Sequence, residues 1–238
     1  MDELAELREQ VKAEREARLK LERELEEERE ARRALEAKVR ELQFKVEIDA
    51  DTGLLNKHAF MDRIEREKGR MEFMRRLEDE WFGKHPHSRR PRLSPVEQSL
   101  AVVMIDADRL KYVNDTFGHK KGDELLKAIA DAMRRAIRPD DEAARLGGDE
   151  FALLLRKADV RIARKVCRRL LTILAHERLA VPDAEIEIHS SVGAAVYQIG
   201  TSTSIEDVIR AADLEMYTYK QRRRSGLPSP VTVRKFLP

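Results

Sequence analysis

Residues 99–108 read SLAVVMIDAD, an apolar run that stops abruptly at two aspartates. An uninterrupted run of this length predicts a short strand buried in a sheet. Two further strands are predicted at residues 143–146 and 151–155, on either side of the sequence GGDE at 147–150. A pair of glycines between apolar strands is typical of a tight hairpin turn. If the three strands are neighbours, acidic residues gather at one edge of the sheet.

The rest of this region alternates between helical and extended patterns. Apolar residues recur with a helical period up to residue 137, and helices are predicted over residues 57–77, 160–176 and 204–222. Strands are predicted over residues 186–197 and 231–233, and a proline-rich loop over 83–95. The order β-α-β-β-α-β-α-β contains a ferredoxin-like core. We therefore expect an α+β fold, with helices on one side of an antiparallel sheet.

Three carboxylates are expected to meet at the sheet edge: Asp106 from the end of the first strand, and Asp149 and Glu150 from the hairpin. Clustered carboxylates repel one another unless they are protonated or bind cations. Hard oxygen ligands favour Mg²⁺, which usually also contacts substrate phosphates. The glycine pair taken alone is equally typical of an ordinary turn with solvated acids. The strand-terminal aspartate and the basic residues further along the chain favour a functional site.

Basic side chains that complement phosphate follow the acidic ones along the chain. Lys111 comes shortly after the first strand, and Lys220 and Arg224 are four residues apart, on one face of a helix. Asn114 and Asp123 flank a turn and offer an amide and a carboxylate. A carboxylate can accept two N–H groups from the edge of guanine, whereas adenine lacks that pair of donors. The pattern therefore favours a guanine nucleotide.

Composition excludes several classes of protein. Lysine and arginine number 47 and aspartate and glutamate 45, so the net charge of +2 does not favour a nucleic-acid-coating protein. A single cysteine excludes an intramolecular disulfide and a cysteine-rich zinc site. The sequence has no apolar run long enough for a transmembrane helix, and its first residues lack the pattern of a signal peptide. We expect a cytoplasmic protein with no membrane segment in this chain.

The first 48 residues contain neither glycine nor proline and consist mainly of strong helix formers. Apolar residues repeat in heptads, with Leu4, Val11, Leu25, Val39 and Val46 at one seam position and Leu7, Leu21, Leu35 and Leu42 at the other. A seam sustained over about six heptads predicts a coiled coil about 70 Å long, and therefore a homodimer. The alternative is a single solvated helix held by ion pairs four residues apart.

Polar residues interrupt this seam twice. Glu14 with Arg18, and Glu28 with Arg32, occupy seam positions fourteen residues apart. A neighbouring stripe would place Ala17 and Ala31 in the seam instead. Two registers of similar stability would form a rotary switch, which crosslinking of cysteines introduced at position 17 or 18 would test.

The runs IDADRLKYVNDTFGHKKGDELL (105–126) and RLGGDEF (145–151) together resemble the GGDEF-domain diguanylate cyclases. DADTGLLNKHAF upstream, and SSVGAAV and AADLEMYTYK downstream, resemble further motifs of that family in the same order. The likeness covers residues 49–224, so we expect a signalling coiled coil at 1–48 and a catalytic domain at 49–238. It implies a nucleotidyl-cyclase-like sheet and the condensation of two GTP into cyclic di-GMP and two pyrophosphates by paired domains.

The resemblance also implies roles for individual residues. Asp106, the carbonyl of Ala107 and Asp149 would bind Mg²⁺, with Mn²⁺ as a substitute. Asp149 or Glu150, with Asp149 favoured, would help to remove the proton of the 3′-hydroxyl, and Lys111 would stabilise the transition state. Substrate binding is implied for Asn114, His119, Asp123, Gly147, Gly148, Lys220 and Arg224. Asn114 and Asp123 would recognise guanine, and Lys220 and Arg224 would hold the terminal phosphates.

An inhibitory product site is implied by Arg138 and Asp141, an RxxD pattern that ends five residues before the GGDEF motif. Arg168 or Arg169 would supply a second arm. Four features depart from the family pattern: Asp51 replaces a leucine, Lys57 replaces an arginine, Arg109 begins a pair that is usually aromatic, and 15–20 extra residues lie between Asn56 and Asp106. The alternatives are a catalytically silent receptor for cyclic di-GMP and a coiled-coil interaction module. The upstream signal and the basal activity cannot be read from the sequence.

Overall fold

The structure, a computed structural model, describes residues 15, 18, 20–33, 35, 38, 47–88 and 91–236. The chain divides into two compact units, Met1–Val46 and Glu47–Pro238. No helix in the described ranges is both long enough and apolar enough to cross a membrane.

The first unit is helical wherever it is described. Ion pairs one turn apart run along it, including Arg18 with Glu22 at 3.0 Å. Leu21 and Leu35 of the predicted seam expose 66% and 65% of their surface, and Leu25 exposes 45%. The other six seam residues, and Glu14 and Ala17 of the predicted switch, lie outside the described residues. The coiled coil and the homodimer stay predictions.

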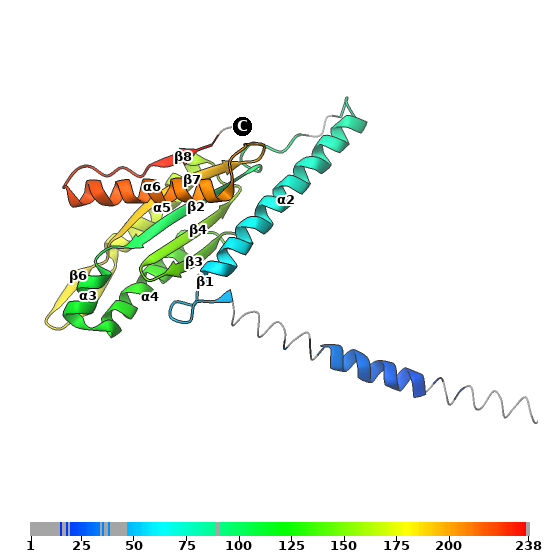
Figure 1. Ribbon diagram of the computed structural model, residues 1–238, viewed down its shortest axis with the longest axis horizontal. Helices are drawn as coiled ribbons and strands as arrows, with labels where there is room; N and C mark the ends of the chain where they lie inside the picture. The colour runs from blue at the N-terminus through cyan, green and yellow to red at the C-terminus, as the bar shows by residue number, and fades with distance from the viewer. Residues whose placement is uncertain are drawn as a thin grey trace, which may run out of the picture. The chain divides into compact units, whose positions relative to one another are not determined.

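The second unit is built on a six-stranded sheet with β2 near its centre (Figure 1). Strand β2 pairs antiparallel with β4 and β7, while the pairs β1·β3 and β7·β8 are parallel. In order across the sheet the strands are β1 (Leu55–Asn56), β3 (Glu142–Gly147), β4 (Glu150–Arg156), β2 (Ser99–Ala107), β7 (Ser190–Gln198) and β8 (Val233–Lys235). All nine residues of β2 are buried, which confirms the strand predicted from its apolar run.

Helices cover both faces of this sheet, so the prediction of helices on one side is wrong. One face packs against α4 (His119–Ala136) and α5 (Val160–His176), and the other against α2 (Lys57–Lys84) and α6 (Ile205–Arg224). Successive side chains of β2 point to opposite faces, so Val103 joins the first core and Val102 the second. A strand that is apolar throughout must be shielded from water on both faces, which explains why helices pack on the second face of the sheet as well.

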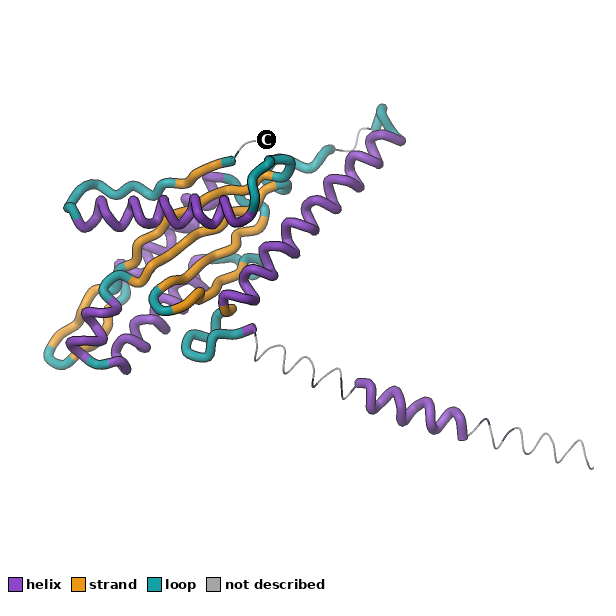
Figure 2. Tube along the Cα trace, in the orientation of Figure 1, coloured by secondary structure: helices purple, strands orange, loops and turns teal. Residues whose placement is uncertain are grey.

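Side-chain caps fix where three of these helices begin. Asn56, Asp159 and Ser204 each accept a hydrogen bond from the backbone N–H three residues ahead, at the starts of α2, α5 and α6. Gly118, with φ +83°, separates α3 (Leu110–Phe117) from α4, so that the helical pattern after β2 forms two helices (Figure 2).

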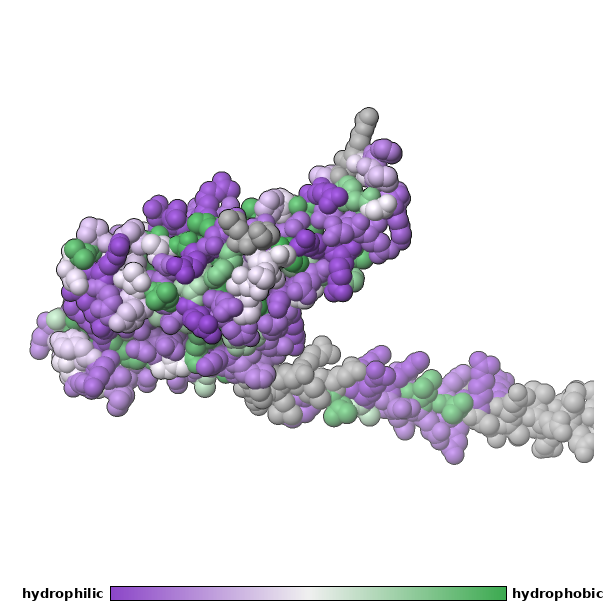
Figure 3. Space-filling model, turned by 45° about the horizontal axis from the view of Figure 1, so that its top comes forward, coloured by the Kyte–Doolittle hydropathy of each residue, from purple (hydrophilic) through white to green (hydrophobic). Residues whose placement is uncertain are grey.

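Two other boundaries differ from those predicted. The single strand predicted over 186–197 is two strands, because β6 (Ala184–Glu187) pairs with β5 (Arg178–Val181) in a separate hairpin and β7 joins the main sheet. Helix α2 runs seven residues past the predicted end at 77. Its extension meets the proline-rich loop, where Met74, Leu77 and Trp81 help to line an apolar groove of about 280 Å³. Apolar side chains are visible on the surface in this region (Figure 3).

Candidate functional site

The structure brings the three predicted carboxylates to one edge of the main sheet. Asp106 lies opposite Glu150 of β4 and opposite Ser191 of β7 in the strand pairing. The backbone N–H of Ala107 donates to the carbonyl of Asp149 at 2.8 Å, which fastens the end of β2 to the hairpin turn. This hydrogen bond holds the end of β2 next to the turn between β3 and β4. The backbone of the sheet therefore positions the acidic residues.

The Asp106 carboxylate is the most enclosed of these groups, with 12% of its side chain exposed. Burial raises its pKa, the neighbouring Asp149 and Asp108 add to the rise, and Lys220 opposes it. The Lys220 ammonium, from α6, donates to Asp106 at 2.5 Å. The predicted phosphate-binding lysine therefore reaches the acidic edge although it lies 114 positions further along the chain, and the rise in the pKa of Asp106 comes mainly from burial.

A basic pocket of about 240 Å³ lies beside this edge. Asp108 accepts from the Ser191 hydroxyl at 3.0 Å and pairs with Arg223 of α6 at 3.0 Å. The pocket is lined by Asp108, Arg109, His189, Ser191, Lys220, Arg223 and Arg224. Burial and the nearby Arg223 and Arg109 lower the pKa of His189, against the pull of Glu187 and Asp108. Four lysine and arginine side chains facing one carboxylate make this pocket suitable for a polyphosphate.

Sequence reasoning named Lys220 and Arg224 for this pocket but missed most of its other residues. Arg223 belongs to an arginine run that also reads as a solvated helix end. Arg109 was visible only as a departure from an aromatic pair, and it adopts the left-handed backbone conformation at φ +66°. His189 and Ser191 arrive from β7 and the loop before it, a juxtaposition that only the strand pairing creates.

The two residues predicted to recognise guanine lie where α3 meets α4. Asn114 is half-buried on α3, while Asp123 and His119 are exposed on the first turns of α4. A Cβ atom at Gly122 would lie 1.9 Å from Oδ1 of Asn114, so the glycine makes room for that amide. Lys111 is exposed on α3.

The glycine turn is open on its outer side and anchored on its inner side. Gly147 and Gly148 have φ values of +149° and +50°, and a Cβ atom at either would meet nothing within 4 Å. Arg145 donates to the carbonyl of Gly148 from two nitrogens, at 3.0 and 3.1 Å. The same guanidinium bonds Asp49 at 3.3 Å and Asp51 at 2.7 Å. The segment before β1 is thereby tied to the glycine turn.

Asp49 is the less exposed of the two aspartates that bond Arg145, and it also accepts hydrogen bonds within its own loop. Its carboxylate accepts from the Thr52 N–H at 3.0 Å and from the Thr52 hydroxyl at 2.6 Å. Burial alone would raise the pKa of Asp49, but these hydrogen bonds and the charge of Arg145 outweigh it, so the pKa falls below its ordinary 3.8. Neither Asp49 nor Arg145 was predicted as a site residue, because they lie 96 positions apart.

Replacing Asp49 by asparagine should cost about 1.5–3 kcal/mol of unfolding free energy at pH 7, the value of hydrogen bonds to a charged group. A carboxylate with a lowered pKa stabilises the fold above the ordinary 3.8 and loses that effect as the pH falls through the lowered value. The gap between parent and variant should therefore shrink below about pH 4. Urea unfolding across this range measures it. Asp51→Asn, on the exposed partner of the same arginine, should cost under about 0.5 kcal/mol.

A second polar pocket, of about 400 Å³, surrounds the RxxD pattern. The buried Asp141 carboxylate accepts from the backbone N–H groups of Arg138 and Arg156, at 3.1 and 3.0 Å. The lining residues are Glu67, Arg70, Arg138, Asp140, Asp141, Arg156 and Lys157. The second arm predicted at Arg168 or Arg169 is not among them; Arg169 instead donates to the carbonyl of Ala136. The additional basic groups come from α2 and from the end of β4.

Comparison with known proteins settles the family. Residues 86–226 match the family model described as the GGDEF domain of diguanylate cyclases. The chain belongs to this family. The GGDEF domain is 36% identical over 137 residues to the probable diguanylate cyclase DgcJ of Escherichia coli, a match that covers 56% of this chain and 26% of DgcJ. Across the first three curated relatives, the chain spans 19–34% of their length.

Two solved structures are similar to most of the chain. The coiled coil and GGDEF domain of DgcB from Caulobacter crescentus, in complex with c-di-GMP, superposes with a TM-score of 0.66 at 22% identity, covering 90% of this chain and 98% of that one. Diguanylate cyclase SiaD from Pseudomonas aeruginosa, in complex with its activator SiaC, gives a TM-score of 0.61 at 27% identity, covering 98% and 79%. The first likeness is one of fold.

Within the described ranges, no group of three or more histidine, cysteine, aspartate or glutamate side chains is arranged to hold a metal ion. The predicted site uses two carboxylates and one backbone carbonyl, and therefore does not depend on such a group.

Proposed function

We propose that this chain is a diguanylate cyclase that condenses two GTP molecules into cyclic di-GMP and two pyrophosphates. One observation carries the proposal: the Asp106–Lys220 pair joins the acidic edge to a pocket with three further arginines. A polyphosphate in that pocket would present its α-phosphate to the carboxylates. The family membership supports the same reaction.

The oxygen donors at the edge fit a hard divalent cation. Asp106 and Asp149 lie close enough for the charge of Asp149 to raise the pKa of Asp106. Mg²⁺, or Mn²⁺ in its place, would be held by these carboxylates and the Ala107 carbonyl, and would neutralise charge on the phosphates. Lys220 would then exchange its contact with Asp106 for a phosphate oxygen.

In the reaction, the 3′-oxygen of each GTP attacks the α-phosphorus of the other, a P–O bond forms, and pyrophosphate leaves with the electrons of the broken bond. The hydroxyl proton passes to Asp149, with Glu150 as the neighbouring carboxylate. Lys111 stabilises charge on the transferring phosphoryl group, while Lys220 and Arg224 hold the terminal phosphates. Positioning and charge neutralisation supply most of the catalysis.

Each domain holds one GTP, so two domains must face each other for both bonds to form. The predicted coiled coil supplies that pairing as a homodimer, and a parallel arrangement places both domains at the same end. Arg138 and Asp141 line a separate pocket that we assign to product inhibition. The substrate and product are cytoplasmic nucleotides, which agrees with the expected location.

The direct test is to incubate the chain with GTP and Mg²⁺ at increasing protein concentrations and to separate the nucleotides by chromatography. We expect cyclic di-GMP, with a specific activity that rises with concentration until the dimer saturates. Binding of cyclic di-GMP without synthesis at any concentration would instead favour a silent receptor.

Asp123→Ala should reduce the preference for GTP over inosine triphosphate by about 10²-fold. Alanine cannot accept the N–H groups of guanine, so the site would no longer distinguish guanine from a base that lacks the 2-amino group. Inosine triphosphate lacks the 2-amino group that the carboxylate would accept. The measurement is kcat/KM for both nucleotides. Asp115→Asn, an exposed change on α3, is the matched control. An unaltered preference in the Asp123 variant would remove this residue from base recognition.

A further inference from the structure

The inhibitory pocket contains a buried carboxylate that the RxxD pattern does not include. Glu67, on α2, exposes 4% of its surface, although α2 is otherwise rich in exposed charge. It lies at the pocket lining with Arg70, one turn along the same helix. An ionised group is seldom buried unless it is paired, so its partners indicate what it does.

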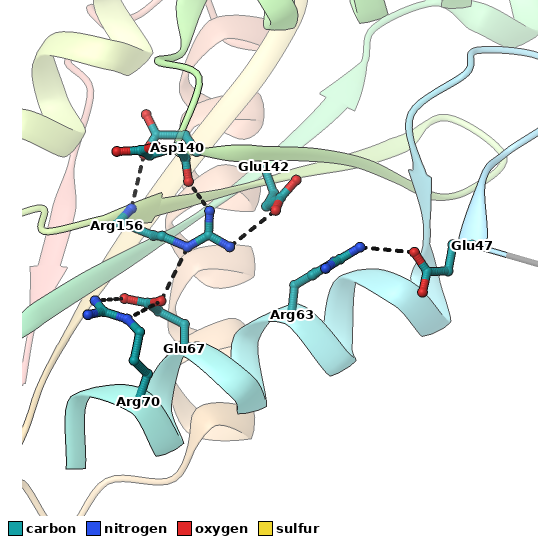
Figure 4. A network of polar contacts seen from close by, with 8 residues as sticks. Glu47, Arg63, Glu67, Arg70, Asp140, Glu142 and Arg156 are labelled. Atoms are coloured by element: carbon teal, nitrogen blue, oxygen red, sulfur yellow. Dashed lines mark hydrogen bonds and ion pairs between the residues drawn. The ribbon is translucent and has the colours of Figure 1, made fainter. Parts of the chain in front are cut away.

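Glu67 is paired with two guanidinium groups of the pocket. Arg70 donates to it from Nε at 2.9 Å and from Nη2 at 2.5 Å, and Arg156 donates from Nε at 3.2 Å. Figure 4 shows Arg156 between Glu67 and Glu142, with Arg70 on the other side of Glu67. Arg156 also bonds Glu142 at 3.1 Å and the carbonyl of Asp140. Glu67 thus already occupies two of the basic groups that a phosphate would seek.

We propose that Glu67 weakens product inhibition, acting as a built-in anion that competes with the product phosphates for Arg70 and Arg156. The inference rests on the proposed function, since it takes cyclic di-GMP as the ligand of this pocket. Cyclic di-GMP carries two negative charges, and four basic side chains of the lining face three carboxylates. To bind, the product must approach the Glu67 charge or draw Arg70 away from it.

The position of Glu67 makes its charge effective. Water screens exposed carboxylates strongly, but a buried one interacts through a medium of lower effective dielectric constant. Arg70 exposes 46% of its side chain, so it can turn toward a ligand, whereas Glu67 is fixed by the core beneath α2. Neutralising Glu67 therefore releases a mobile guanidinium and removes a repulsive charge at the same time.

The test measures the inhibition constant of cyclic di-GMP in the full chain and in Glu67→Gln, with binding followed by calorimetry. We expect the inhibition constant to fall about tenfold, because glutamine keeps an acceptor oxygen and loses the charge. Glu142→Gln is the matched control: it removes the other carboxylate on Arg156, 28% exposed and outside the pocket lining, and should change the constant less than twofold. An unchanged or higher constant in a folded Glu67→Gln chain overturns the proposal.

A double variant covers the case in which Glu67→Gln does not fold, because breaking one half of a buried ion pair is costly. Glu67→Met with Arg156→Met removes both charges and leaves neither unpaired in the interior. The reference is Arg156→Met alone, in which Glu67 still pairs with Arg70. Relative to that variant, the double variant should lower the inhibition constant by about threefold, because Arg70 is released; equal constants in the two variants contradict the proposal.

Arg138→Ala distinguishes a wrong role for Glu67 from a wrong assignment of the inhibitory site. If the parent is inhibited, Arg138→Ala relieves it and Glu67→Gln changes nothing, only the role of Glu67 is wrong. If the parent synthesises cyclic di-GMP and neither binds it at this pocket nor is inhibited by it, the inhibitory site itself is wrong and the role of Glu67 falls with it.

Discussion

Asp106→Asn should reduce cyclase activity about 10³-fold or more, in a chain that still folds. Asp106 is the carboxylate from the central strand, it is nearly buried, and it contacts Lys220 directly. Asparagine keeps the shape and one acceptor oxygen, but it lacks the charge that would bind a divalent cation and orient the lysine. Cyclic di-GMP formation in saturating GTP and Mg²⁺ measures the loss, and a thermal melt shows that the sheet is intact.

Asp131→Asn is a suitable control for this change. Asp131 lies on α4, where 67% of its side chain is exposed and it pairs with Arg134 at 2.6 Å. Its replacement should leave activity within about twofold of the parent, because an exposed ion pair contributes little. Residual activity within tenfold in Asp106→Asn would show that the carboxylates of the hairpin hold the metal without it, and would move the site away from β2.

The acidic edge could be predicted from the sequence because its signals are local. A continuous apolar run marks β2, two glycines mark the turn, and the acids follow each at once. Regular apolar spacing likewise identified α4 and α5, although Gly118 divides the first helical segment into two. The resemblance then assigned roles that the spacing alone could not, including those of the Ala107 carbonyl and Arg138.

The parts that escaped prediction depend on contacts between distant residues. Arg145 meets Asp49 across 96 positions, and Arg156 meets Glu67 across 89. Nothing in the neighbourhood of Glu67 distinguishes it from the exposed glutamates of α2; only the fold shows that it faces the core. The β5–β6 hairpin was missed for a different reason, since each of its strands has only four residues, too few to establish an apolar alternation.

Gly193→Ala should destabilise the domain by about 3 kcal/mol or more, through overpacking against backbone that cannot move aside. Gly193 lies in the middle of β7, opposite Met104 of β2. A Cβ atom there would lie 2.0 Å from the backbone nitrogen of Met216 and 2.4 Å from the carbonyl oxygen of Ala212, both in α6. At about 2–4 °C per kcal/mol for a domain of this size, Tm should fall by about 6–12 °C.

The same change should also damage the site, because α6 carries Lys220 toward Asp106 and Arg224 toward the phosphate pocket. If the variant folds by moving α6 outward, the KM for GTP should rise along with the loss of stability. Gly69→Ala is the matched control: it lies on the exposed side of α2 with nothing within 4 Å of its Cβ position. It should stabilise the chain by about 0.5–1 kcal/mol through helix propensity. Equal melting temperatures for the two variants would mean that α6 does not pack on β7 as closely as this fold requires.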